Sequence, residues 1–234
     1  MATKKTAAVK TVKTRSTKID KDAKKPNSPT DMELAILKVA FLLTALDGRI
    51  DETERAVYDR LASRCKEVDA EQAKKVLEEV DTAVAKLTSD KEVYFDKTIT
   101  SSMLFGSMIG KEIGKEATFL TKIDIFMAEV KKFCDWREFV RDSSRVRRAF
   151  IMWTAMALAD GDYKSIEREA INKLKEMVNS FELISSKFLS DAESEIKEIF
   201  KLSGMIGMAK DINESATLND RRDAKYSVLR EMAR

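Results

Sequence analysis

Two short stretches decide the fold of this chain: residues 45–55 read ALDGRIDETER, and residues 158–169 read LADGDYKSIERE. When the sequence is compared with itself at a shift of 113 positions, Asp47-Gly48 falls on Asp160-Gly161, and the Glu-Arg pair that follows falls on a second Glu-Arg pair. The match needs no gap over about thirty positions, and self-similarity at a fixed interval is typical of an internal duplication. The sequence therefore predicts two copies of one structural unit.

The residues around each Asp-Gly pair predict helices of two kinds. Upstream, residues 34–43 and 150–158 are apolar almost all round, which is typical of helices at the centre of a bundle. Downstream, apolar residues recur at steps of three and four and mark one face of an amphipathic helix. We expect two central helices packed together, each with an amphipathic partner, related by a pseudo-twofold axis. The downstream apolar positions are Tyr58, Leu61, Cys65 and Val68 in the first copy and Ile171, Leu174, Val178 and Phe181 in the second.

Composition favours an all-α fold, a helical bundle without a sheet. The 234 residues include only 7 Gly and 2 Pro, while charged residues make up 35% and hydrophobic residues 44%. So few helix breakers among so many good helix formers favour helix over strand. Capping-box patterns begin at Thr30, Asp51, Asp69, Ser89 and Ser190. We expect helices at about 30–46, 51–66, 69–87, 90–116, 119–141, 144–159, 165–188, 190–209 and 214–233.

The chain divides into a basic tail, a helical domain and an extension. Residues 1–30 contain nine Lys or Arg and two Asp, so this segment carries +7 and the rest of the chain −4 of the total charge of +3. We expect residues 1–29 to be disordered, because they contain too few large apolar groups to offset the entropy of ordering. The other predicted parts are a domain over 30–205, with repeats near 34–68 and 147–181 and a helical insertion near 90–142, and a C-terminal helical extension over 206–234.

The two Asp-Gly turns hold the candidate site. A purely structural role explains much of the pattern: each Gly follows a helix end in a left-handed conformation, and Asp51 and Ser165 cap the next helices. The alternative is a site for a divalent cation, calcium or magnesium, which carboxylate oxygens bind. The spacing is not that of an EF-hand, and Lys164 stands where the first copy has Asp51. The candidate metal ligands are Asp47, Asp51, Glu54, Asp160, Asp162 and Glu167.

The repeated pattern of helix, Asp-Gly, short acidic segment, Glu-Arg and helix resembles the tellurite-resistance TerB family. Residues 39–61 and 148–177 look like its two signatures, within a similarity that extends over about 30–205. The resemblance implies an all-helical duplicated fold, a role in bacterial stress responses (tellurite, phage, colicin or envelope stress) and metal binding at acidic positions. The interval between the copies is longer than is usual in the family, and the resemblance explains neither the basic tail nor the residues after 205.

The sequence does not predict an enzyme. It contains no His, the side chain most often used for proton transfer near neutral pH, so a Ser or Cys nucleophile would lack its usual base. Cys65 and Cys134 lie far apart and in no CxxC motif, which argues against a disulfide framework or a zinc site and favours a reducing compartment. No apolar run is long enough to cross a bilayer, and the N-terminus lacks the core of a secretion signal. We therefore expect a cytoplasmic protein.

Three functional hypotheses stay open. The first is a TerB-like adaptor that responds to divalent cations at the turns and recruits a protein partner. The second is a metal-free assembly protein that forms a homo-oligomer through Gly- and Met-rich stretches at 101–114 and 202–209, which internal packing would also explain. The third is a protein that associates with an anionic membrane surface through its basic tail. Nucleic acid is not an expected partner, because the tail has no aromatic side chain to stack on bases.

Overall fold

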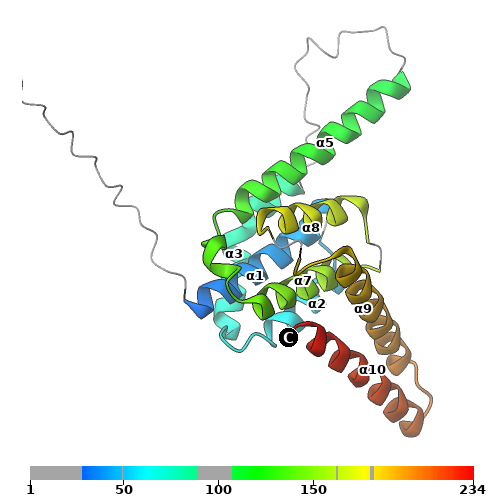
Figure 1. The fold of residues 1–234 in the computed structure, drawn as a ribbon. Coiled ribbons are helices and arrows are strands. Elements are labelled where there is room, and N and C mark those ends of the chain that lie inside the picture. Colours follow the sequence, from blue (N-terminus) through cyan, green and yellow to red (C-terminus); the bar gives the residue numbers. More distant parts are fainter. Residues whose placement is uncertain (1–27, 49, 89–106, 162, 180–181) are drawn as a thin grey trace, which may run out of the picture.

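The computed structural model describes residues 28–48, 50–88, 107–161, 163–179 and 182–234. Over these ranges the regular structure is helical and no strand is present, which confirms the predicted all-α bundle. The α-helices, joined in chain order (Figure 1), are α1 (Pro29–Thr44), α2 (Glu52–Ala62), α3 (Ala70–Leu87), α5 (Ser107–Val130), α6 (Trp136–Phe139), α7 (Ser143–Ala157), α8 (Ser165–Met177), α9 (Ser186–Gly207) and α10 (Ile212–Met232). A short 3-10 helix, η1 (Ala45–Asp47), continues α1.

Helices α1 and α7 pack against each other at the centre of the molecule. The indole Nε1 of Trp153, on α7, donates a hydrogen bond of 3.0 Å to the backbone oxygen of Ile36, on α1. Trp153 is fully buried, and its ring contacts those of Phe139 and Phe150. Helices α2, α3, α5 and α8 surround this pair (Figure 1). The two apolar stretches therefore form the central helices, as their all-round apolar character predicts.

The two Asp-Gly turns have the same geometry at corresponding positions of the two copies. The backbone N–H of Gly48 donates to the oxygen of Ala45 at 3.1 Å, and that of Gly161 donates to the oxygen of Leu158 at 3.0 Å. Both glycines have positive φ, 98° and 88°, a conformation that side-chain-bearing residues avoid. The donors and acceptors of the two bonds are related by the same 113-position shift that aligns the sequences.

Some predicted helix starts are wrong by a few residues. Helix α1 is capped by Ser28, whose hydroxyl accepts from the N–H of Asp31, and not by Thr30. Helix α9 begins after Ser185, so Ser190 lies inside it. Lys164 holds the N-cap position of α8, and Ser165 is its first residue. The predicted boxes at Asp51 and Asp69 are confirmed, since each side chain accepts from the N–H three residues on.

Two predicted helices have different lengths. The break expected between 116 and 119 is absent, because α5 continues through it to Val130. The helix expected over 165–188 ends at Met177, where Asn179 adopts a positive φ of 46°. Asparagine tolerates this left-handed conformation and often ends helices in this way. Ser89, Glu92, Gly106, Asp162 and most of the predicted tail lie outside the described residues.

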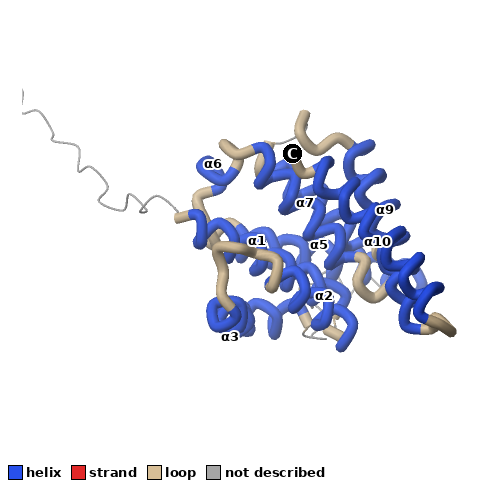
Figure 2. The backbone as a smooth tube through the Cα atoms, turned by 90° about the horizontal axis from the view of Figure 1, so that it is seen from below, coloured by secondary structure: helices blue, strands red, loops and turns tan. Residues whose placement is uncertain are grey.

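Helices α9 and α10 form an antiparallel hairpin at one side of the body, away from α1 and α3 (Figure 2). Their apolar contacts make a second, smaller core that includes Ala155 and Leu158 of the α7 region together with Ile196, Ile199 and Leu229 of the hairpin. The predicted boundary at residue 205 falls within α9. Among the described residues, no helix combines the length and apolar character needed to cross a bilayer.

Candidate functional site

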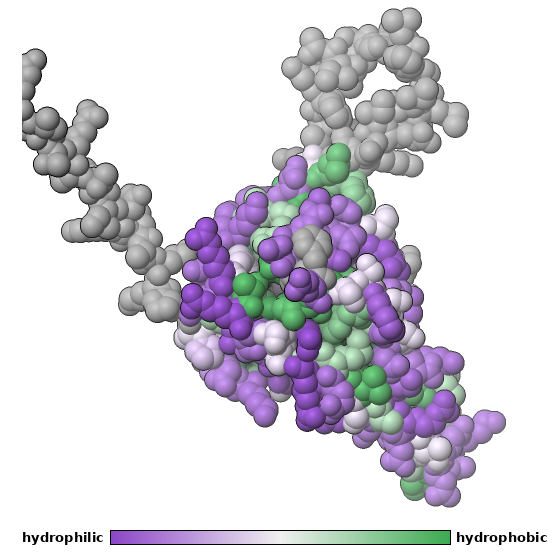
Figure 3. Space-filling model, in the orientation of Figure 1, coloured by the Kyte–Doolittle hydropathy of each residue, from purple (hydrophilic) through white to green (hydrophobic). Residues whose placement is uncertain are grey.

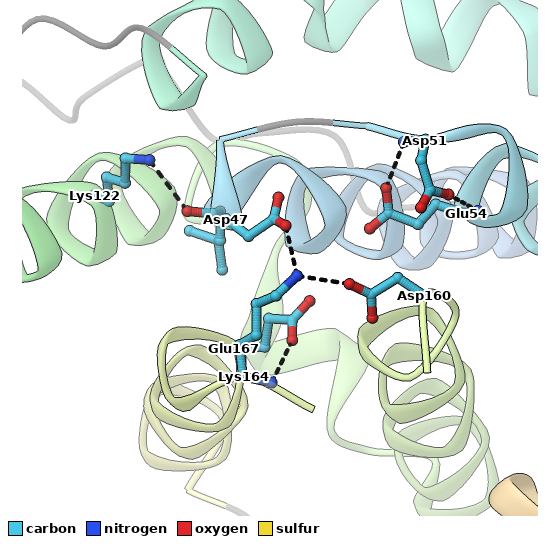
Figure 4. Close-up of polar contacts among 8 residues, drawn as sticks. Asp47, Asp51, Glu54, Lys122, Asp160, Lys164 and Glu167 are labelled. Carbon is cyan, nitrogen blue, oxygen red and sulfur yellow. Dashed lines mark hydrogen bonds and ion pairs between the residues drawn. The ribbon is translucent and has the colours of Figure 1, made fainter. Parts of the chain in front are cut away.

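The two turns meet because α1 and α7 pack against each other, and Asp47 and Asp160 face the same lysine (Figure 4). Asp47 closes η1, and Asp160 precedes the second glycine turn. Each is almost fully buried, with 8% and 10% of its side chain exposed. Two carboxylates from distant parts of the sequence are thus held in a region with little water to screen their charges.

Lys164 lies between these carboxylates and bridges the two repeats. Its Nζ is 2.6 Å from Asp47 Oδ2 and 2.6 Å from Asp160 Oδ2 (Figure 4). Burial opposes the charged form of this ammonium, but its hydrogen bonds to Asp160 and Asp47 outweigh that effect and raise the pKa of Lys164. The lysine therefore stays protonated and supplies a fixed positive charge between the turns.

Glu54 and Glu167 occupy equivalent positions beside the bridge, each in the first turn of its helix. Glu54 Oε2 accepts the backbone N–H of Asp51 at 2.8 Å, and Glu167 Oε2 accepts that of Lys164 at 2.9 Å. Both residues are buried, with 3% and 2% of their surface exposed. Burial, reinforced by the charges of Asp47 and Asp160, raises the pKa of Glu54 to about 7 and that of Glu167 to about 8. Both carboxyls therefore gain or lose protons near neutral pH.

A second lysine contacts the first turn from a different helix. Lys122, on α5, donates from Nζ to the backbone oxygen of Leu46 at 3.3 Å. A Cβ atom added to Gly48 would lie 3.4 Å from this Nζ, so the lysine lies directly against the turn. This contact links α5 to the candidate site, although α5 belongs to neither repeat.

The structure brings together four of the six residues expected to bind metal. Asp47 and Asp160 contact the ammonium of Lys164, and Glu54 and Glu167 lie beside these aspartates; the five residues form the junction. Asp51 lies at the edge, where its Oδ1 accepts the N–H of Glu54 at 2.9 Å as a helix cap. Asp162 lies outside the described residues. Within the described ranges, no group of three or more Asp, Glu or Cys side chains is arranged to hold a metal ion.

Sequence reasoning missed the central role of Lys164, which the sequence shows only as a difference between the two copies. The signal was its place in the repeat: at a shift of 113 positions it replaces Asp51, the N-cap of the first copy. A lysine side chain cannot accept a hydrogen bond, so it cannot cap the helix as aspartate does. It reaches across to the opposite turn instead.

Comparison of the chain with known protein families, with curated proteins and with solved structures found no match.

Proposed function

We propose that this protein is a non-enzymatic, TerB-like binding or scaffolding module of a bacterial stress response, in which a divalent cation acts at the junction. The observation that carries the proposal is the bridge of Lys164 between Asp47 and Asp160. Within the junction, two aspartates face one ammonium and leave one negative charge over, and each glutamate adds another when it ionises. Such a group attracts a second cation, and oxygen ligands suit calcium or magnesium.

A divalent ion would compete with two groups already at the junction. It would take carboxylate oxygens from Lys164, and it would displace protons from Glu54 and Glu167, whose raised pKa values keep them partly protonated near neutrality. Metal binding that requires deprotonated ligands strengthens as pH rises. Because Lys164 connects the turn after α1 to the start of α8, its release would alter how the two repeats are held together.

The test is isothermal titration of calcium, magnesium, manganese and zinc into chelator-stripped protein. Three proteins are compared: the unmodified chain, an Asp47→Asn/Asp160→Asn variant and a Lys164→Ser variant. We expect saturable binding that the double substitution abolishes and that Lys164→Ser strengthens, because serine removes the competing charge and leaves space. Absence of binding to the Lys164→Ser protein by all four ions would contradict a cation site at the junction.

One observation favours a second candidate, assembly through the tip of the α9–α10 hairpin. Met205, Met208 and Ile212 are exposed there, with 76% of Met208 and 87% of Ile212 accessible to solvent. Figure 3 shows a small apolar spot at this tip among polar residues. Gly204 and Gly207 have no neighbour within 4 Å of an added Cβ, so internal packing does not account for them among the described residues. Sedimentation of the protein with and without Met208→Lys/Ile212→Lys tests self-association. Unchanged, monomeric sedimentation of both proteins at high concentration would argue against it.

A further inference from the structure

A groove of about 650 Å³ lies between the α9–α10 hairpin and the helices α2 and α7. Helix α9 packs on α7, whereas α10 packs mainly on α9, so α10 and α2 face each other across this groove. None of the junction residues lines it. Its volume falls in the range of roughly 300–1,000 Å³ that is typical of sites for small molecules.

The floor of the groove is apolar. Ile151 and Met152 of α7 contribute to it, together with Ile196 and Ile199 of α9 and Leu229 of α10. Ile196, Ile199 and Leu229 belong to the second core and are almost fully buried, so the floor is the edge of a packed apolar layer. A hydrocarbon chain that binds there would move from water to an apolar surface. This transfer contributes a favourable free energy of roughly 25 cal/mol for each Å² of apolar surface buried.

The rim of the groove carries three exposed arginines, Arg60, Arg64 and Arg230. No described carboxylate pairs with any of them. Arg64 lies with its guanidinium carbon 4.3 Å from the ring centroid of Tyr226. Arg230 donates within its own helix, to the backbone oxygen of Tyr226 and to the hydroxyl of Ser227.

The other charges along the groove are already compensated. Arg148 pairs with the buried carboxylate of Glu33. Asp223, the one acidic residue among the described lining residues, lies 3.6 Å from Arg222. The groove therefore combines an apolar floor with a rim that has an excess of three positive charges, on a body whose sequence beyond the tail is mildly acidic.

We infer that this groove binds a small anionic amphiphile, a single hydrocarbon chain with a carboxylate or phosphate head. The chain lies on the floor, and Arg60, Arg64 and Arg230 hold the head, since the planar guanidinium pairs with both kinds of anion through two hydrogen bonds. A concave floor between four helices is out of reach of a flat bilayer surface. The volume of about 650 Å³ suits a ligand of this size, since small-molecule sites fall in the range of roughly 300–1,000 Å³.

The test is isothermal titration of dodecanoate and dodecyl phosphate, below their micellar concentrations, into the full chain. Dodecyltrimethylammonium has the same chain with a positive head and serves as the ligand control. The protein variant is Arg60→Gln/Arg230→Gln, in which both changes lie on exposed helical positions and need not disturb folding. Its matched control is Arg137→Gln/Arg141→Gln, which removes the same charge from exposed arginines outside the groove.

We expect one saturable site for both anions, at least about tenfold weaker in Arg60→Gln/Arg230→Gln and unchanged in the control, a difference that corresponds to about 1.4 kcal/mol. The cationic amphiphile should bind weakly or not at all. Two results would overturn the assignment of the anionic head to the arginine rim. One is an equal loss of affinity for the anions in both variants, and the other is an equal affinity of the unmodified chain for the cationic amphiphile. Failure of both anions to bind, with binding only to vesicles of phosphatidylglycerol or to an acidic peptide, would overturn the inference.

Discussion

Replacing Lys164 by methionine tests the central electrostatic feature of the junction. Methionine keeps the length and much of the apolar stem of lysine but removes the ammonium that contacts Asp47 and Asp160 at 2.6 Å. The two aspartates, 8% and 10% exposed, would then face each other without the bridging charge. Removing one partner of a buried ion pair leaves a desolvated charge uncompensated, which is far more costly than losing an exposed pair.

The expected loss in the free energy of unfolding of Lys164→Met depends on how deeply the ion pairs are buried. Breaking a fully buried pair costs about 3–5 kcal/mol. The side chain of Lys164 is 27% exposed, so water reaches the junction and the cost falls to about 2–3 kcal/mol. For a domain of this size that corresponds to a fall in melting temperature of roughly 5–10 °C. Lys187→Met is the matched control, because Lys187 is also 2.6 Å from its partner, Asp191, but is 82% exposed. Lys187→Met should lower the free energy of unfolding by no more than about 0.5 kcal/mol.

Urea unfolding at pH 7, followed by the circular dichroism of the helices, measures both variants. The urea midpoint should fall for Lys164→Met. The slope of the unfolding free energy against urea concentration should not change, since the surface exposed on unfolding stays the same. In an Asp47→Asn/Asp160→Asn background the same substitution should lower the free energy of unfolding much less. The two asparagines carry no charge, so loss of the ammonium leaves no negative charge uncompensated there. A loss for Lys164→Met no larger than that for Lys187→Met would refute the assignment of the bridge as a buried, stabilising contact.

Three further predictions concern the junction, its turns and the central helices. Glu167→Gln keeps a side-chain oxygen that can accept a hydrogen bond from the backbone N–H of Lys164, but the glutamine side chain has no group that ionises. The folded protein holds a proton on Glu167 up to a pKa of about 8, whereas an unfolded glutamate releases it near 4.5, so stability should fall as pH rises between these values. The urea midpoints of Glu167→Gln at pH 5 and pH 8.5 should therefore differ less than those of the unmodified chain. Gly161→Ala should destabilise the protein by about 1–2 kcal/mol because φ is 88° there, although an added Cβ meets nothing within 4 Å. Gly204→Ala, equally free of contacts but inside α9, should stabilise by about 0.5–1 kcal/mol, and parallel thermal melts compare the two. Trp153→Ala should cost about 3–5 kcal/mol in urea unfolding, since it empties a fully buried site and removes the donor to Ile36.

The sequence predicts the turns well because their chemistry is local. A Gly after an Asp at a helix end, followed three residues later by the start of a capping box, specifies φ and hydrogen bonds within one or two turns of chain. Gly48, Asp51 and Glu54 behave accordingly. The cap of α1 could have been found by the same reasoning, because Pro29 favours the first helical position and thereby points to Ser28.

The bridge depends on packing that no local pattern contains. Lys164 and Asp47 are 117 residues apart, and their contact exists only because α1 and α7 place the two turns together. The raised pKa values of Glu54 and Glu167 likewise follow from burial between helices, which a sequence window does not report. The early end of α8 was missed because apolar spacing continues to Phe181, while the left-handed backbone of Asn179 stops the helix.

The separate core of the α9–α10 hairpin has a consequence for how the protein opens. Helix α10 packs mainly on α9, and the body is held by its own, larger core. Segments that share few apolar contacts with the rest of a protein unfold locally at a lower free energy than the whole. Backbone amides of α10 should therefore exchange with deuterium well before those of α1 and α7. Among the described helices, α10 is then the one that a protease reaches first by local unfolding, while the duplicated body remains folded.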